Sequence, residues 1–219
     1  MYVAQQNAPG VQFHPLLHFF ARVISVVLHP LFVPVYVAWF LIYVYHLFPA
    51  AEPGHRGLLL LRFGVMYTIF PLVTVLLLKG LGFVQSVRLS TQKERIIPYV
   101  ACGVYYFWMW YVLHNQPQTP VQMELFALGI FLASSLGLML NSYFKISMHA
   151  IAAGVAIVFM SIMAFYSFTS FGFYLSVTLL AAGLLCTARL MNNEHYPLDV
   201  YAGLLAGMLS QLVAYWFVY

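Results

Sequence analysis

Long apolar stretches dominate this 219-residue chain, and seven of them are candidates to cross a lipid bilayer. A helix needs about 20 mostly apolar residues to span the hydrocarbon core. The chain is 63% hydrophobic and only 6% charged, which is too few charges to build a water-soluble surface. We therefore expect an all-α fold, a polytopic bundle of about six to seven transmembrane helices. The stretches are Val23 to Phe48, Leu58 to Leu78, Pro98 to Leu113, Leu125 to Leu140, Met148 to Phe168, Phe171 to Ala188 and Val200 to Tyr219.

The connections between these stretches are too short to hold a soluble domain, and the sequence shows no internal repeat. We therefore expect one transmembrane domain over residues 1–219, with its functional motifs between residues 88 and 199. The first stretch contains Pro30 and Pro34, which predict a kink or an interfacial segment that leads into the span.

Most of the charged residues gather in three clusters that separate the apolar stretches. The clusters run from Arg88 to Arg95, from Lys145 to His149 and from Arg189 to Asp199. Two stretches lie between each cluster and the next, so all three are predicted to emerge on the same membrane face. Ionisable groups that converge at a membrane boundary indicate a functional site.

The clusters contain the groups that phosphoryl transfer requires. A transferred phosphoryl group carries negative charge on its oxygens, which fixed cations and hydrogen-bond donors stabilise. Arg88, Arg95 and Arg189 supply planar, permanently charged donors, and Ser147 adds a hydroxyl.

Two histidines and the chain's single aspartate complete the predicted chemistry. His195 and Asp199 are four residues apart, about one turn if the last helix begins near Pro197. The carboxylate can then orient the imidazole and leave its other nitrogen free to attack phosphorus. His149 arrives from another connection and can protonate the leaving group.

In order and spacing, these residues resemble the three-part signature of the type 2 phosphatidic acid phosphatase superfamily, which includes membrane lipid phosphatases and vanadium haloperoxidases. The third part, Ser-Arg, five residues, His, three residues, Asp, is met by Ala188-Arg189, His195 and Asp199. The second part, Pro-Ser-Gly-His, is met by Ile146-Ser147-Met148-His149. The first part, Lys, six residues, Arg-Pro, is met by Arg88 and Arg95, with Ile96 in place of the proline.

The resemblance implies that His195 forms a phosphohistidine, with Asp199 as its partner and His149 as general acid. It also implies that the phosphate is bound by Arg88, Arg95, Ser147 and Arg189. Ala188 and Met148 depart from the pattern, because they remove a hydroxyl and a glycine. Those departures bear on the substrate and on catalytic strength more than on the fold.

We therefore predict a lipid phosphate or pyrophosphate phosphatase that needs no metal and no cofactor. A phosphotransferase with the same site, and a lipid-phosphate binder or transporter without catalysis, are the alternatives. A metal site made of His149, Glu194, His195 and Asp199 is disfavoured, because the surrounding arginines repel a cation. Histidines inside apolar stretches, such as His29 and His46, are interpreted as interhelical hydrogen-bonding groups.

The expected partners are a lipid phosphate substrate and membrane lipids. Nucleic acid is not expected, because the nine Lys and Arg residues form no basic stripe. We expect a multi-pass protein of the cell (inner) membrane. Lys and Arg are more numerous in the connections on the site's side, which by the positive-inside rule points the site toward the cytoplasm. We expect the arginines of the site to bind the phosphate, however, and the resemblance implies an extracytoplasmic site. We expect the extracytoplasmic face.

Overall fold

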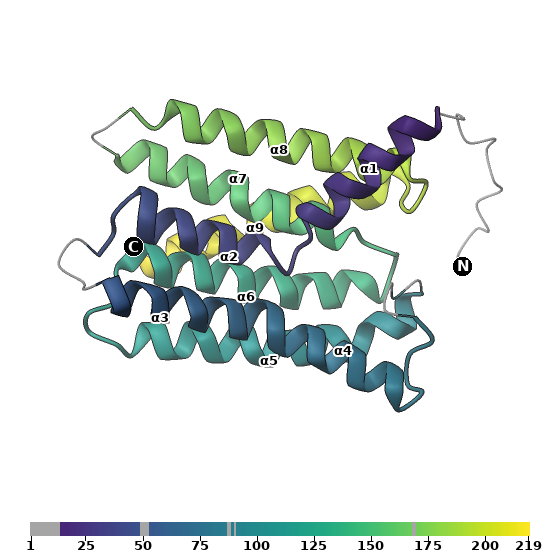
Figure 1. The fold of residues 1–219 in the computed structure, drawn as a ribbon, viewed down its shortest axis with the longest axis horizontal. Coiled ribbons are helices and arrows are strands. Elements are labelled where there is room, and N and C mark those ends of the chain that lie inside the picture. Colours follow the sequence, from purple (N-terminus) through teal and green to yellow (C-terminus); the bar gives the residue numbers. More distant parts are fainter. Residues whose placement is uncertain (1–13, 49–52, 87–88, 90, 168–169) are drawn as a thin grey trace.

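The structure is a computed structural model that describes residues 14–48, 53–86, 89, 91–167 and 170–219. Within these residues all the regular elements are helices (Figure 1). They are α1 (Pro15–Val27), α2 (Val33–Trp39) with a π-helical turn (Phe40–Val44), α3 (Pro53–Gly64), a second π-helical turn (Val65–Ile69), α4 (Phe70–Gly80), α5 (Gln92–His114), α6 (Val121–Asn141), α7 (Met148–Tyr166), α8 (Gly172–Met191) and α9 (Pro197–Val218).

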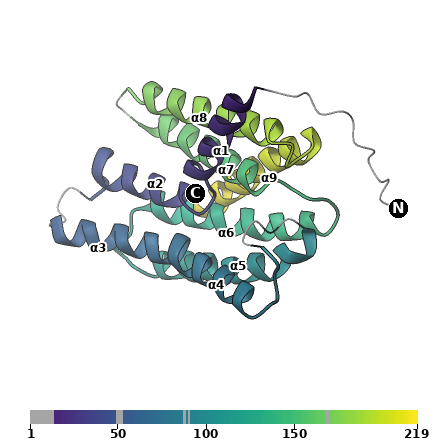
Figure 2. The same ribbon diagram turned by 45° about the vertical axis from the view of Figure 1, so that its right-hand side comes forward.

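Six helices of the described part are long and apolar enough to cross a membrane, which confirms a multi-pass membrane protein. The first of them runs without interruption from Gly54 to Gly80 through α3, the second π-helical turn and α4; the others are α5 to α9. The long helices lie roughly along one direction in both views (Figures 1 and 2). Large apolar side chains such as Phe165, Phe173 and Trp216 cover the outside of the bundle. An apolar exterior suits contact with lipid tails, so these six helices correspond to the last six predicted stretches.

The first predicted stretch, Val23 to Phe48, is not one span. It is divided between two short helices, and α1 already ends at Val27. Pro30 and Pro34 explain the interruption, because proline donates no backbone hydrogen bond and disfavours helical geometry in the residue before it. In Figure 1, α1 begins near the end of α8 and α2 ends beside the start of α3, so together they make one broken crossing.

Side chains satisfy the backbone groups that the interruption frees. The Tyr36 hydroxyl donates to the carbonyl of Val27 at 2.9 Å, and the Thr68 hydroxyl donates to the carbonyl of Leu31 at 2.7 Å. The N–H of Leu31 donates to Nδ1 of His29 at 3.3 Å. Non-helical backbone at membrane depth is stable only when its polar groups find such partners. These hydrogen bonds therefore stabilise the interrupted backbone between α1 and α2.

Glycines bring α9 against α7 and so position the charged ends of both helices. A Cβ atom at Gly207 would lie 2.0 Å from the carbonyl oxygen of Ile151, and one at Gly203 would lie 2.8 Å from that of Ser147. Small residues four apart allow this close approach, which is a common device in membranes. At the end of the contact, the N–H of Ser147 donates to the carbonyl of Asp199 at 3.2 Å. The α7–α9 packing thus sets the distance between the second and third charge clusters.

Candidate active site

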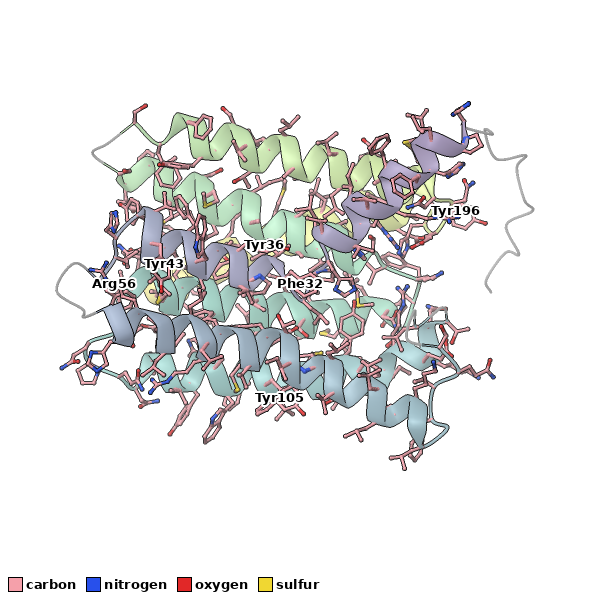
Figure 3. The ribbon with its side chains drawn as sticks, viewed as in Figure 1. Phe32, Tyr36, Tyr43, Arg56, Tyr105 and Tyr196 are labelled. Atoms are coloured by element: carbon pink, nitrogen blue, oxygen red, sulfur yellow. The ribbon has the colours of Figure 1, made fainter. Side chains whose placement is uncertain are left out.

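The described residues of the three charge clusters lie at one end of the bundle, as the spacing of the clusters predicts. Gln92 and Asn141 exchange two side-chain-to-backbone hydrogen bonds of 2.8 and 3.0 Å, which tie the start of α5 to the end of α6. The Lys145 ammonium donates to the carbonyl of Glu194 at 3.4 Å and links the second cluster to the third. Tyr196 marks this end of the molecule in Figure 3, and Arg56 marks the opposite end.

Arg95 connects the first cluster to the second from the first turn of α5. Its side chain is buried, its Nε donates to the carbonyl of Leu89 at 2.9 Å, and its Nη1 donates to the carbonyl of Ile146 at 2.9 Å. Because backbone carbonyls are neutral, these two hydrogen bonds do not neutralise the guanidinium charge. Arg95 is therefore a fixed cation at the site.

His195 is oriented mainly by a backbone carbonyl. Its Nδ1 donates to the carbonyl of Lys145 at 3.1 Å, whereas the nearest oxygen of Asp199 lies 3.6 Å away. That same carboxylate oxygen accepts the N–H of Tyr196 at 3.0 Å, at the beginning of α9. Since a carbonyl can only accept, Nδ1 carries the proton. Nε2 of the neutral ring is then the nitrogen with a free lone pair.

The surroundings of His195 keep it neutral. Burial lowers the pKa of this histidine, the nearby Asp199 carboxylate opposes that shift, and the positive charges of Arg189, Arg95 and Lys145 lower it further. The net pKa lies below the ordinary value of 6.5. At neutral pH the ring is unprotonated, which is the state a nucleophile requires.

His149 lies in the first turn of α7 and is held from the broken crossing. Its Nε2 donates to the carbonyl of Ser25 in α1 at 3.1 Å. The ring of His29, in the α1–α2 connection, meets the His149 ring edge to face, with 5.1 Å between centroids and 84° between planes. The histidine predicted as general acid is therefore fixed by residues far outside the three clusters.

Arg189, at the end of α8, is paired with the carboxylate of Glu194. The guanidinium is 8% exposed and the carboxylate 48% exposed. A bidentate donor that already holds a carboxylate has the geometry to hold a phosphate oxygen in its place. Glu194 thus stands at the position where a substrate anion would pair with Arg189.

A cavity of about 1210 Å³ connects this charged end to the apolar interior of the bundle. It extends past Arg22 and His29 of the first crossing and reaches side chains of α5, α6 and α7. Its apolar lining includes Pro98, Phe126, Ile130 and Val155. The cavity can therefore receive a polar head and an apolar tail of one molecule.

The predicted site residues divide into three groups. Four of them line the cavity, two are buried outside its lining, and one lies outside the described residues. Ser147, in the second group, caps α7, because its hydroxyl oxygen accepts the N–H of Ala150 at 3.4 Å. Among the residues that the structure describes, no three His, Cys, Asp or Glu side chains gather at one point. The residues that line the cavity are Arg95, His149, Arg189 and His195. Those buried outside its lining are Ser147 and Asp199, and Arg88 lies outside the described residues.

Sequence reasoning missed the acceptors that orient the two histidines. The carbonyls of Lys145 and Ser25 carry no sequence signal, because every residue has a carbonyl group. His29 did leave a signal, since it directly precedes Pro30 inside an apolar stretch. A polar residue next to a helix break in a membrane span is a candidate for a functional site.

The fold and the site define a multi-pass membrane protein with a cavity that opens onto buried arginines and histidines. The model of the PAP2 superfamily matches residues 110–219 of the chain. This protein belongs to the PAP2 superfamily, which supports a phosphatase-type activity. The match contains the second and third clusters, whereas Arg88 and Arg95 lie before it. Comparison with curated proteins and with solved structures found no match.

Proposed function

We propose that this protein hydrolyses a lipid phosphate or pyrophosphate through a phosphohistidine on His195. The observation that carries the proposal is the cavity, which joins a histidine- and arginine-lined end to an apolar interior. Its volume of about 1210 Å³ exceeds the roughly 300–1,000 Å³ of ordinary small-molecule pockets. A phosphate bound at Arg189 can therefore carry a long apolar chain that remains inside the bundle.

The orientations of the His195 and His149 rings suggest which nitrogen of each takes part in the reaction. Nε2 of His195 attacks phosphorus, the bond from phosphorus to the leaving oxygen breaks, and protonated His149 gives its proton to that oxygen. Neutral His149 then takes a proton from a water molecule, whose oxygen attacks the phosphohistidine. The phosphorus–nitrogen bond breaks, which releases phosphate and restores neutral His195.

The remaining site residues bind the phosphate or hold the histidines. Arg95 and Arg189 stabilise the charge on the phosphoryl oxygens, and Arg88 is proposed to join them. Asp199 supports the imidazolium character that His195 gains as it forms the bond to phosphorus. Ser147, which the sequence motif suggests as a phosphate ligand, is buried outside the cavity lining and is proposed to fix the start of α7.

We place the site on the extracytoplasmic face of the cell membrane. The cations at the site end serve the phosphate, so their number is a poor guide to orientation under the positive-inside rule. Cysteines introduced singly at Gln92, Asn193 and Gln116 into a variant without Cys102 and Cys186 test the placement. Gln92 and Asn193 should react from outside intact cells with a membrane-impermeant reagent, and Gln116, in the α5–α6 connection, should react only after lysis. The reverse pattern would place the site in the cytoplasm.

The function itself is tested by turnover and by trapping the intermediate. Purified protein should release phosphate from lipid phosphates in the presence of EDTA, and rapid acid-free quench should show phosphate label on His195. The His195→Ala variant should neither turn over nor label. Labelled wild-type protein that passes its phosphoryl group to alcohols and not to water would instead identify the phosphotransferase. Release that stops with EDTA and returns with zinc or magnesium would contradict the metal-independent mechanism.

A further inference from the structure

The broken first crossing reaches the site at the interruption between α1 and α2. Two of its groups contact the same imidazole, since the carbonyl of Ser25 accepts from Nε2 of His149 and the ring of His29 packs edge to face against it. Both Ser25 and His29 also line the cavity, as His149 does. Residues 14–48 therefore form part of the wall around the proposed general acid.

This contact decides which nitrogen of His149 can transfer a proton. Because Nε2 donates to the Ser25 carbonyl, Nδ1 is the nitrogen left for the leaving group. A single hydrogen bond fixes one point of the ring but still permits rotation about that point. The edge-to-face contact with His29 restricts this rotation, because the two ring planes stand at 84°.

His29 is itself held in one orientation. Its Nδ1 accepts the N–H of Leu31 at 3.3 Å, a local hydrogen bond within the interruption that also fixes the protonated nitrogen as Nε2. The neighbouring carbonyl of Leu31 is anchored by Thr68 of the first long span. The ring that packs against His149 is therefore fixed at both its backbone and its side chain.

We propose that His29 is a positioning residue for His149. It keeps the imidazole of the general acid aimed at the leaving oxygen, while the Ser25 carbonyl holds the opposite nitrogen. The inference rests on the proposed function, in which His149 protonates the leaving group. His29 acts through His149 and touches no reacting atom in this role.

Two substitutions separate the ring contact from the local hydrogen bond. Asparagine at a turn accepts the N–H two residues ahead through its side-chain oxygen, so His29→Asn keeps the bond to Leu31 and removes the ring. His29→Phe keeps a ring and removes the bond. His14→Asn is the matched control, because Nδ1 of His14 accepts the N–H of Leu16 at the same 3.3 Å, at an exposed position outside the cavity lining.

The kinetic signature of a positioning role is selective for the leaving group. His29→Asn should lower kcat for a lipid phosphate about 10- to 100-fold, because misplacement of a catalytic group by about 1 Å costs rate of that order. An activated aryl phosphate needs little protonation and should lose less than about threefold. His29→Phe should remain within a few-fold of wild type on both substrates. In a His149→Ala background, His29→Asn should cause no further loss.

A second readout does not depend on turnover. Carbethoxylation of His149 by diethylpyrocarbonate, followed by mass spectrometry on the full chain in detergent micelles, reports how freely the imidazole presents its nitrogens. His29→Asn should raise the modification rate several-fold, and His14→Asn should leave it unchanged. Size-exclusion chromatography and melting temperature check that each variant is folded.

The outcomes separate the two proposals. Wild-type protein that neither hydrolyses lipid phosphates nor forms the phosphohistidine removes the proposed function, and the modification rates then still decide whether His29 holds His149. Wild-type behaviour of His29→Asn in both assays overturns the positioning role. Equal losses on lipid and aryl substrates, accompanied by a lower melting temperature, also overturn it in favour of a purely structural contact.

Discussion

His195 donates from Nδ1 to the backbone carbonyl of Lys145, at 3.1 Å. The carbonyl is a nearer acceptor for the proposed nucleophile than the Asp199 carboxylate, whose oxygen lies 3.6 Å from the same nitrogen, so the carbonyl can set the tautomer. In serine protease triads, by contrast, an aspartate performs this task, and its conversion to asparagine costs about 10⁴-fold in kcat through the wrong tautomer. This difference leads to an unusual expectation for Asp199.

Asp199→Asn should lower kcat by only about 10- to 10²-fold, well short of the loss in a protease triad. The Lys145 carbonyl still holds Nδ1–H, and the asparagine oxygen can still accept the N–H of Tyr196. The loss comes from the missing negative charge beside the imidazolium character of the transition state. Steady-state kinetics with a lipid phosphate measure it. A loss of about 10⁴-fold or more would mean that Asp199, and not Lys145, sets the tautomer.

The acidic limb of the pH profile should move in opposite directions in two variants. His195 must be neutral to attack, so kcat/KM falls as pH drops through its pKa, which burial places below 6.5. Asp199 raises that pKa, so Asp199→Asn should move the limb to lower pH. Arg189 lowers it, so Arg189→Gln should move the limb to higher pH. An aryl phosphate substrate keeps the residual rates measurable. Limbs that coincide in both variants would assign the limb to another group.

Glu194→Gln should tighten the binding of vanadate, a mimic of the phosphoryl transition state. The Glu194 carboxylate pairs with Arg189, and an anion must displace it. A half-exposed ion pair contributes at most about 1 kcal/mol, so the inhibition constant should fall about two- to fivefold. Glu124→Gln is the matched control, because Glu124 pairs with His114 in the α5–α6 hairpin, away from the cavity lining. Weaker inhibition in Glu194→Gln would show that the carboxylate helps to hold the anion.

Gly207→Ala should lower the melting temperature, because the new Cβ would lie 2.0 Å from the carbonyl oxygen of Ile151. The α7 and α9 helices must separate, at a cost of about 1–3 kcal/mol or more. Gly183→Ala, in α8 with nothing within 4 Å of its Cβ, is the matched control and should not destabilise the protein. Thermal unfolding in detergent, followed by intrinsic fluorescence, measures both. An unchanged melting temperature for Gly207→Ala would contradict the tight α7–α9 contact.

The long spans and the convergence of the clusters were predictable, because both follow from hydropathy and from the number of crossings between clusters. The broken crossing was only half predicted. Pro30 and Pro34 indicate an interruption, but they do not say that its backbone is held by Thr68 and Tyr36. Sequence spacing likewise cannot show that Ser147 is buried outside the cavity lining and caps α7.

No pattern of residue types predicts which backbone carbonyls accept the hydrogen bonds of His149 and His195. Ser25 and His149 are 124 positions apart, and the acceptor is a backbone atom. Lys145 belongs to the second charge cluster because of its ammonium group, whereas its carbonyl makes the contact with His195. Such contacts depend on the path of the main chain, which hydropathy and motif spacing do not specify.

The interruption between α1 and α2 also limits how this chain can be recombined with its relatives. Ser25 and His29 lie on either side of the end of α1, and both contact His149, which lies in the range matched by the superfamily. A chimera that combines residues 110–219 with a foreign amino-terminal half therefore keeps the motif histidine but loses its anchors. Insertion of a single residue between Leu28 and Pro30 has a similar effect, because it alters the spacing of the two anchors. The two halves of the gene are thus expected to diverge together and to tolerate shuffling poorly.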